Sequence, residues 1–97
     1  MVPRIERVRY RFVGRVQRRG FRYACSVSAE RAGATGWVRN ERDGTVTAEV
    51  QGDAQVQLAF VRILSGLVPG FGDGWSVGSE RPIPPVPGDT DFRVRRY

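Results

Sequence analysis

The sequence predicts one α+β domain in which two helices cover one face of a mostly antiparallel sheet. Three observations lead to this fold class. Alternation of apolar and polar residues recurs in several short segments, two longer segments have helical periodicity, and the elements follow the order β-α-β-β-α-β-β. The length of 97 residues leaves room for only one hydrophobic core, so we take residues 1–97 as a single domain.

The first strand is expected over residues 7–13, RVRYRFV, where charged and apolar side chains alternate. Its valine, tyrosine and phenylalanine would face the core. Its three arginines would face solvent, where Glu49 could pair with them. A loop bounded by glycines, GRVQRRG, follows over residues 14–20.

The first helix is expected over residues 21–32 and ends at Gly33, a residue that readily adopts the left-handed conformation of a helix stop. Its candidate buried face consists mostly of small residues, which would let the helix lie close to a sheet: Phe21, Cys25, Ser28, Ala29 and Ala32. We expect Cys25 to be a buried structural thiol rather than a nucleophile.

Two strands are expected over residues 35–40, TGWVRN, and 45–51, TVTAEVQ. An Asp-Gly pair at 43–44 lies between them, and this dipeptide is typical of a hairpin turn because glycine accepts positive φ. We expect Trp37 in the first of these strands to belong to the core.

The second helix is expected to follow Gly52-Asp53, with Asp53 capping its N-terminus, and to end at Val68-Pro69-Gly70. Its apolar residues recur at i, i+3, i+4 and i+7, which is the clearest helical pattern in the chain. They are Val56, Ala59, Phe60, Ile63, Leu64 and Leu67.

The C-terminal part is expected to contain a strand near 75–81 and a last strand over 91–96. Four prolines between them are expected to exclude regular structure over 82–88. The whole order corresponds to a ferredoxin-like α/β sandwich, βαββαβ plus a C-terminal strand.

Composition limits the chemistry. The chain has no histidine, which excludes Ser-His and Cys-His nucleophile systems, and its single cysteine can form no internal disulfide and makes a poor metal site. All 16 basic residues are arginine and the net charge is +6, which suits either nucleic acid or small phosphorylated anions as partners. No apolar run approaches ~18 residues and no signal-like segment is seen, so we expect a cytoplasmic protein that does not span a membrane.

The loop over 14–20 runs into the expected start of the first helix, and such a junction favours anions. Backbone N–H groups converge there, and the helix dipole adds partial positive charge. Arg22 falls in the first helical turn, where its guanidinium could grip a phosphate with two parallel hydrogen bonds.

Two motifs at this junction and after it resemble those of one family. The segment GRVQRRGFRY resembles the acylphosphatase signature, roughly G-x-V-Q-G-V-x-F-R, and TGWVRN is similar to the second motif of that family, G-W-V-x-N. The DGTV that follows and the EVQG at 49–52 also match, and the similarity extends over nearly the whole chain.

The resemblance implies a hydrolase that cleaves acyl phosphates without a metal, a cofactor or a covalent intermediate. Arg22 matches the phosphate-binding arginine, and Asn40 matches the asparagine that orients the attacking water. The phosphate would lie in a cradle of backbone amides from Arg15, Val16, Gln17, Arg18, Arg19 and Gly20. Inorganic phosphate or sulfate would be site ligands, and we expect a monomer whose natural acyl phosphate the sequence does not define.

The sequence departs from the family pattern within this loop. The family usually has Gly-Val where Arg18-Arg19 stands here. If the glycine position requires positive φ, an arginine costs on the order of 1 kcal/mol. Two added guanidiniums would instead strengthen the attraction for anions, and the sequence does not decide which effect is larger.

The alternative is a non-catalytic module of the same fold that binds an anion or RNA. RNA-recognition domains share this element order and stack bases on aromatic residues of their central strands. The third strand expected here has no aromatic residue, so we do not expect nucleic acid as a partner.

Overall fold

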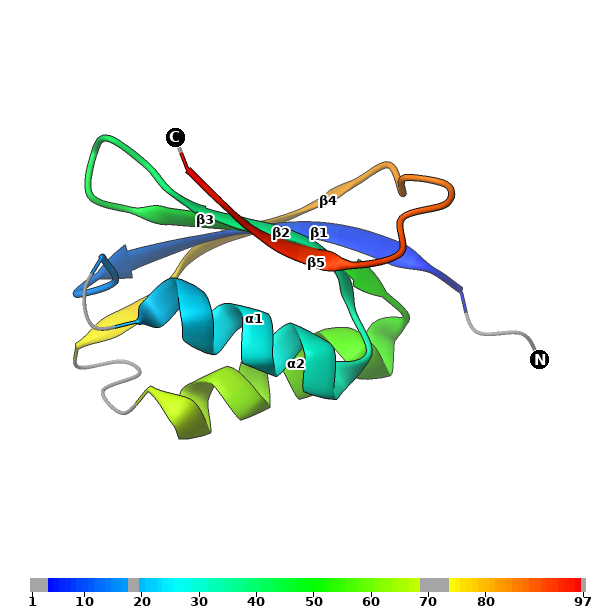
Figure 1. Ribbon diagram of the computed structural model, residues 1–97, viewed down its shortest axis with the longest axis horizontal. Coiled ribbons are helices and arrows are strands. Elements are labelled where there is room, and N and C mark those ends of the chain that lie inside the picture. Colours follow the sequence, from blue (N-terminus) through cyan, green and yellow to red (C-terminus); the bar gives the residue numbers. More distant parts are fainter. Residues whose placement is uncertain (1–3, 18–19, 69–73, 97) are drawn as a thin grey trace.

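The fold is seen in a computed structural model that describes residues 4–17, 20–68 and 74–96. Its elements are β1 (Glu6–Gly14), α1 (Phe21–Ala32), β2 (Thr35–Asn40), β3 (Val46–Gly52), α2 (Ala54–Leu67), β4 (Trp75–Ile83) and β5 (Phe92–Arg95). The strands form one sheet in the order β4-β1-β3-β2-β5, and only β2 and β5 run parallel. Both helices cover the same face of this sheet (Figure 1), so the predicted fold class is confirmed.

The core lies between the sheet and the two helices, and β1 supplies its centre. Tyr10 and Phe12 are buried there, as the alternation in β1 predicted. The ring of Phe12 packs edge-on against the rings of Phe21 and Trp75, with centroids 5.4 and 5.7 Å apart, and Phe60 of α2 packs on the same cluster. This cluster fixes the start of α1 against the sheet.

The small residues of α1 lie against the sheet, as predicted. Its buried residues are Phe21, Ala24, Cys25, Ser28 and Ala29. Burial raises the pKa of the Cys25 thiol well above its ordinary value, so this cysteine is a structural group. Gly33 ends the helix with φ 81°, which confirms the predicted stop.

The two local turn signals are also confirmed. Asp43 accepts hydrogen bonds from the Thr45 amide (3.0 Å) and hydroxyl (2.6 Å), and Gly44 has φ 92°. Asp53 accepts a hydrogen bond of 2.9 Å from the Val56 amide and so caps α2. Neither helix has the length and apolar character that crossing a bilayer requires, within the described residues.

One predicted boundary is wrong. Strand β4 extends through Pro82 to Ile83, although prolines were expected to exclude regular structure from residue 82 onward. Pro82 pairs with Val8 of β1, and β4 lies at the edge of the sheet. An edge strand tolerates proline because only one of its sides takes part in the ladder of hydrogen bonds.

Trp37 is not a core residue. It alternates with buried Val38 along β2, so its ring lies half-buried on the open face of the sheet, away from the helices. The guanidinium carbons of Arg39 and Arg95 lie 4.9 and 5.2 Å from its centroid. Such cation–π contacts accommodate a large aromatic side chain on a polar surface.

Arg7, expected in solvent, is only 4% exposed. Its guanidinium donates to Glu49 and Asp89 at 2.9 Å and to Gln51 at 3.1 Å. The amide of Val86 and the side chain of Gln51 also exchange hydrogen bonds, so the segment between β4 and β5 covers this end of the open face. The predicted pairing of Glu49 with the arginines of β1 is confirmed.

Candidate active site

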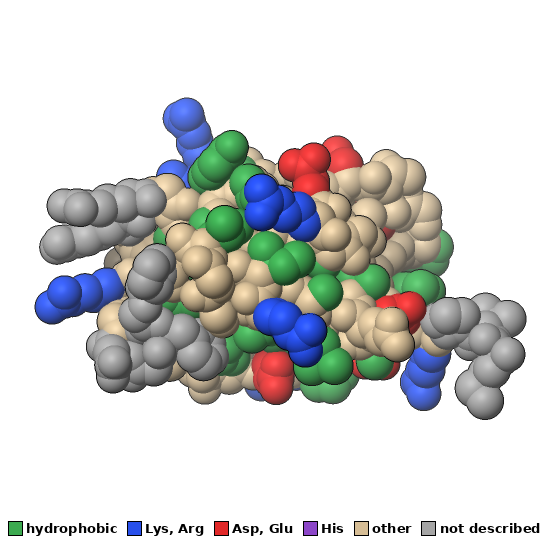
Figure 2. All heavy atoms as spheres, turned by 90° about the horizontal axis from the view of Figure 1, so that it is seen from below, with side chains coloured by type: hydrophobic (Ala, Val, Ile, Leu, Met, Phe, Trp, Pro, Cys, Tyr) green, Lys and Arg blue, Asp and Glu red, His purple; other side chains and the backbone are tan. Residues whose placement is uncertain are grey.

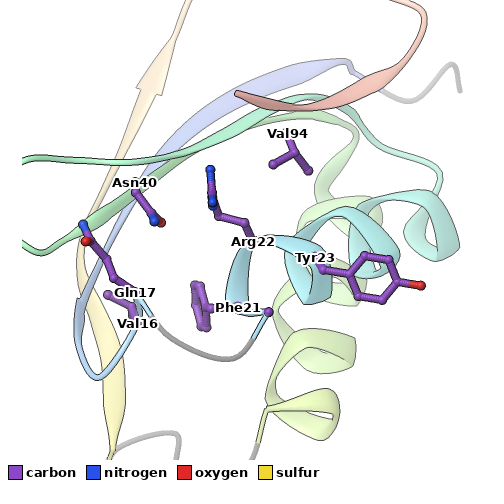
Figure 3. Close-up of a pocket in the computed structure, with 8 residues that line it drawn as sticks. Val16, Gln17, Phe21, Arg22, Tyr23, Asn40 and Val94 are labelled. Carbon is purple, nitrogen blue, oxygen red and sulfur yellow. The ribbon is translucent and has the colours of Figure 1, made fainter. Parts of the chain in front are cut away.

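A cavity of about 340 Å³ opens where the loop after β1 meets the N-terminus of α1 and the end of β2 (Figure 3). Its lining residues are Val16, Gln17, Gly20, Phe21, Arg22, Tyr23, Asn40 and Val94. Three segments far apart in the sequence therefore meet at this cavity.

The first part of the loop is held by the sheet on both sides. The Arg15 amide donates to the carbonyl of Gly74 at 2.7 Å. Gly14 has φ 95°, and a Cβ there would lie 2.6 Å from the same carbonyl oxygen, so only glycine allows this approach. The side chain of Gln17 donates to the carbonyls of Glu41 and, at 2.8 Å, of Thr45, which ties the loop to the β2–β3 hairpin.

The N-terminus of α1 lies at the cavity with no capping side chain. Gly20 occupies the cap position with φ 79°, and the first turn contains no acidic residue. The first N–H groups of a helix have no partner within the helix, and the helix dipole makes that end positive. This end of α1 is therefore suited to bind an anion.

Arg22 extends from the first turn of α1 into the cavity, beneath the end of the sheet (Figure 3). Its Nη1 donates to the carbonyl oxygen of Arg95 at 3.1 Å, which fixes the guanidinium near β5. Within the described residues the guanidinium makes no other hydrogen bond, so the remaining N–H donors of Arg22 are available for a ligand.

Asn40 is the last residue of β2 and enters the same cavity from the sheet (Figure 3). Its Oδ1 atom is buried and has no hydrogen-bond partner among the described residues. A buried carbonyl oxygen without a donor is costly, so this position favours a bound group that donates a hydrogen bond, such as water.

The two residues that flank Asn40 in the sequence, Arg39 and Glu41, form an ion pair. Arg39 donates to Glu41 at 3.1 Å. Burial alone would raise the pKa of Glu41, but hydrogen bonds from Thr47 and Arg39 and the charge of Arg39 hold this pKa below its usual value.

No group of three His, Cys, Asp or Glu side chains in the described part of the chain could hold a metal ion.

The structure brings together most of the residues that the sequence singled out. Arg22 and Asn40 line one cavity with Val16, Gln17 and Gly20. Arg15 instead lines a neighbouring hollow of about 400 Å³, together with Gly14 and Gly44. Arg18 and Arg19 lie outside the described residues.

Three residues that line the cavity were not predicted as site residues: Phe21, Tyr23 and Val94. Phe21 was expected only on the buried face of the first helix, where it also lies. Val94 is 49% exposed and Tyr23 is 71% exposed. The alternation in the last strand placed Val94 on one face but gave no reason to set that face beside Arg22. Only the pairing of β5 with β2 brings Val94 to the site.

The comparisons with known proteins agree with these motifs. A family model described as Acylphosphatase matches residues 8–72. The chain is 57% identical over 49 residues to an acylphosphatase of Nocardioides sp. and 47% identical over 62 residues to one of Rhizobium etli. These segments cover 50% and 63% of this chain, and 50% and 66% of the respective relatives, so the chain spans about half to two thirds of their lengths.

Solved structures give the same likeness over more of the chain. The crystal structure of acylphosphatase from Bacillus subtilis is similar with a TM-score of 0.77 and 27% identity. This match covers 93% of this chain and 98% of the Bacillus subtilis chain.

Proposed function

This chain belongs to the acylphosphatase family, and we propose that it hydrolyses the carboxyl–phosphate bond of an acyl phosphate to a carboxylate and inorganic phosphate. One observation carries the proposal. The Arg22 guanidinium and the Asn40 Oδ1 atom, which has no partner in the described part of the chain, enter one cavity at the N-terminus of α1, where no side chain caps the helix. An anion and a water molecule would each find matching groups there.

The phosphate group would bind at the helix terminus. The free donors of Arg22 would hold two of its oxygens, and backbone amides of the loop over 15–20 would hold the rest. Phosphoryl transfer spreads charge over these oxygens in the transition state, so fixed positive groups stabilise it. Arginine stays protonated at ordinary pH, and this stabilisation would not depend on titration of the protein.

The attacking water would be held by Asn40. Its buried Oδ1 accepts a hydrogen bond from the water and places the water oxygen in line with the bond to be broken. The new P–O bond forms as the bond between phosphorus and the acyl oxygen breaks, and the carboxylate leaves. The proton released by the water passes to a phosphate oxygen, so no general base from the protein is required.

We propose that this reaction needs no metal ion. Arg22 and the helix N-terminus supply the positive charge that a divalent cation would otherwise provide. Inorganic phosphate, which is the product, and sulfate would then occupy the same site as ligands. The expected monomer and the expected cytoplasmic location remain predictions.

The test is hydrolysis of benzoyl phosphate in the presence of EDTA. We expect turnover by the unmodified protein, loss of at least about 100-fold in kcat/KM for Arg22→Ala, and a similar loss for Asn40→Ala. Activity that EDTA abolishes would contradict the metal-free mechanism. Absence of activity in fresh, folded protein would contradict the function itself.

Arg31→Ala is the matched control for Arg22→Ala, because Arg31 lies in the last turn of the same helix. It removes the same charge from α1 at the end far from the cavity and is expected to leave kcat unchanged and to lower kcat/KM by less than about twofold. Equal losses in both variants would mean that Arg22 acts only through the net charge.

The loop substitution needs its own variant. Replacing Arg18 and Arg19 by glycine and valine restores the usual family pattern. A rise in kcat would mean that the arginines strain or obstruct the loop, and a rise in KM would mean that they attract the substrate.

The binding-module alternative has less support. Strand β3 contributes no aromatic side chain, and the ring of Trp37 already contacts Arg39 and Arg95. Salt-sensitive binding of single-stranded RNA without hydrolysis of acyl phosphates would favour it.

A further inference from the structure

A second, larger hollow lies between α2 and the β1–β4 edge of the sheet. Its volume is about 690 Å³, and it shares no lining residue with the candidate active site. We call it the α2 groove; its lining residues are Glu6, Val8, Tyr10, Ala54, Gln57, Leu58, Val61, Glu80 and Pro82. Its volume falls within the range of about 300–1,000 Å³ that is typical of small-molecule sites.

The walls of the α2 groove are apolar. Val8 and Pro82 lie on the sheet side, and Leu58 and Val61 lie on α2. Leu58 is 66% exposed, and exposed hydrophobic side chains are visible on the helical side of the molecule in Figure 2. Helix α2 packs chiefly against α1 and β3, so β4 extends beyond it and leaves this apolar surface open.

Two carboxylates border the apolar surface, Glu6 and Glu80. Glu6 and Glu80 form no ion pair with any other described residue, although the chain carries a net charge of +6. Arginines pair instead with the carboxylates of the open face and the hairpin: Glu41, Asp43, Glu49, Asp89 and Asp91. Two of the four carboxylates that form no ion pair within the described residues, Glu6 and Glu80, therefore border this apolar hollow; the other two are Glu30 and Asp53.

The polar groups at the floor of the α2 groove also favour a cation. The Tyr10 hydroxyl donates to Oε1 of Gln57 at 2.8 Å, and Nε2 of Gln57 donates to the Val50 carbonyl at 2.8 Å. The Tyr10 oxygen keeps its capacity to accept a hydrogen bond. Burial, followed by the charges of Glu80 and Glu6, raises the pKa of Tyr10, so both carboxylates make the potential at the floor negative.

We propose that the α2 groove binds a small organic cation with an apolar body, namely an alkylammonium or arylalkylammonium ion. The apolar body would lie against Leu58, Val61 and Pro82. The ammonium group would lie between Glu6 and Glu80 and donate to the Tyr10 oxygen. Charge complementarity excludes the acyl phosphate as occupant, so this site is separate from the proposed reaction.

The test is an NMR titration of the ¹⁵N-labelled protein with benzylammonium chloride at low ionic strength, in a buffer without amines. We expect saturable shifts of amides around the groove, with Leu58 and Glu80 among them. Substituting both carboxylates, Glu6→Gln with Glu80→Gln, is expected to weaken binding about tenfold, since two opposite charges near the ammonium are lost. The kcat for hydrolysis of benzoyl phosphate by this double variant is expected to be unchanged.

Two controls decide the outcome. Glu30→Gln removes an exposed carboxylate from α1, outside the groove, and is expected to leave the affinity unchanged. Benzyl alcohol, which has the same body without the charge, is expected to bind at least about tenfold more weakly. The proposal would be overturned if benzyl alcohol bound as tightly as benzylammonium, or if Glu30→Gln weakened binding as much as the double variant does. It would also be overturned if benzylammonium shifted the amides near every surface carboxylate. Binding of arginine-containing peptides with none of benzylammonium would also overturn it.

Discussion

Glu49 lies between two arginines on the open face of the sheet. Its Oε1 accepts from Arg7 at 2.9 Å and its Oε2 accepts from Arg9 at 2.6 Å, and its side chain is 8% exposed. Burial alone would raise the pKa of Glu49, but the hydrogen bonds and charges of Arg9 and Arg7 hold it below its usual value. Removing this carboxylate would leave the buried Arg7 guanidinium short of a counter-charge.

We therefore expect Glu49→Gln to lower the free energy of unfolding by about 2 kcal/mol at pH 7, because the buried Arg7 loses one of its two carboxylate partners and keeps only Asp89. Urea denaturation measures this loss. A folded-state pKa below the unfolded value means that the contribution of Glu49 is present at neutral pH. This contribution is lost as the pH falls through about 4.5 and then through the lower folded value. The difference in the free energy of unfolding between wild type and Glu49→Gln should therefore narrow over that pH range. A difference that does not depend on pH would contradict this explanation.

At the same scale, the sequence alone suggested that Arg22 and Asn40 belong to one site, and the structure places both at one cavity, but their surroundings could not be predicted. Arg22 and Asn40 stand in motifs that a sequence displays directly. The burial of Arg7 depends on Asp89, which is 82 positions away in the sequence. No periodicity in β1 distinguishes Arg7 from exposed Arg9, so the difference appears only in the folded chain.

Among the elements, the pairing of β2 with β3 depends on one glycine. Gly36 has φ 134° and lies opposite Val50. A Cβ added there would lie only 1.8 Å from the carbonyl oxygen of Glu49, which belongs to the backbone and cannot move aside. The asparagine of the site stands at the end of this strand, so the pairing also positions Asn40.

We expect Gly36→Ala to destabilise the protein by about 3 kcal/mol or more, through both the clash and the strained backbone. Gly33→Ala is the matched control, because Gly33 also has positive φ (81°) but nothing lies within 4 Å of its added Cβ. Its expected cost is about 1 kcal/mol, the conformational term alone. Thermal or urea unfolding compares the stability of the two variants. Equal losses of stability would exclude the clash with the Glu49 carbonyl as the cause of the effect at Gly36.

Elements with strong local signals were predictable from sequence. The helix over 21–32 and the strand over 35–40 have the predicted bounds, because glycines and a turn mark their ends. Strand β4 was harder, since Pro82 is compatible with a strand only at the edge of a sheet, and strand order is not a local property. Trp37 was expected in the core, whereas its alternation with Val38 along β2 places it on the other face of the sheet.

The molecule as a whole carries an excess of positive charge, and on its helical side the basic side chains do not gather in one patch (Figure 2). Its net charge is +6, and the basic side chains on the helical side are scattered among hydrophobic and acidic ones (Figure 2). Five carboxylates are already paired with arginines within the described residues. The remaining positive charge is available to attract a phosphorylated anion over a distance.

We expect kcat/KM for benzoyl phosphate to fall several-fold between about 0.01 and 0.5 M sodium chloride, while kcat changes little. Salt screens attraction between protein and substrate over the Debye length of roughly 30 Å at 0.01 M, and it acts less on groups already in contact. Steady-state kinetics across this range measures the effect. A kcat/KM that does not depend on salt would exclude steering by the overall charge.

In the proposed reaction, Arg22 and Asn40 have separate roles: Arg22 binds the phosphate, and Asn40 positions the water. Calorimetric titration with inorganic phosphate separates the two roles, because phosphate needs the first residue and not the second. We expect Asn40→Ala to bind phosphate within about threefold of the wild-type affinity although it has lost turnover, and Arg22→Ala to bind at least about tenfold more weakly. Wild-type affinity for phosphate in Arg22→Ala would contradict the account.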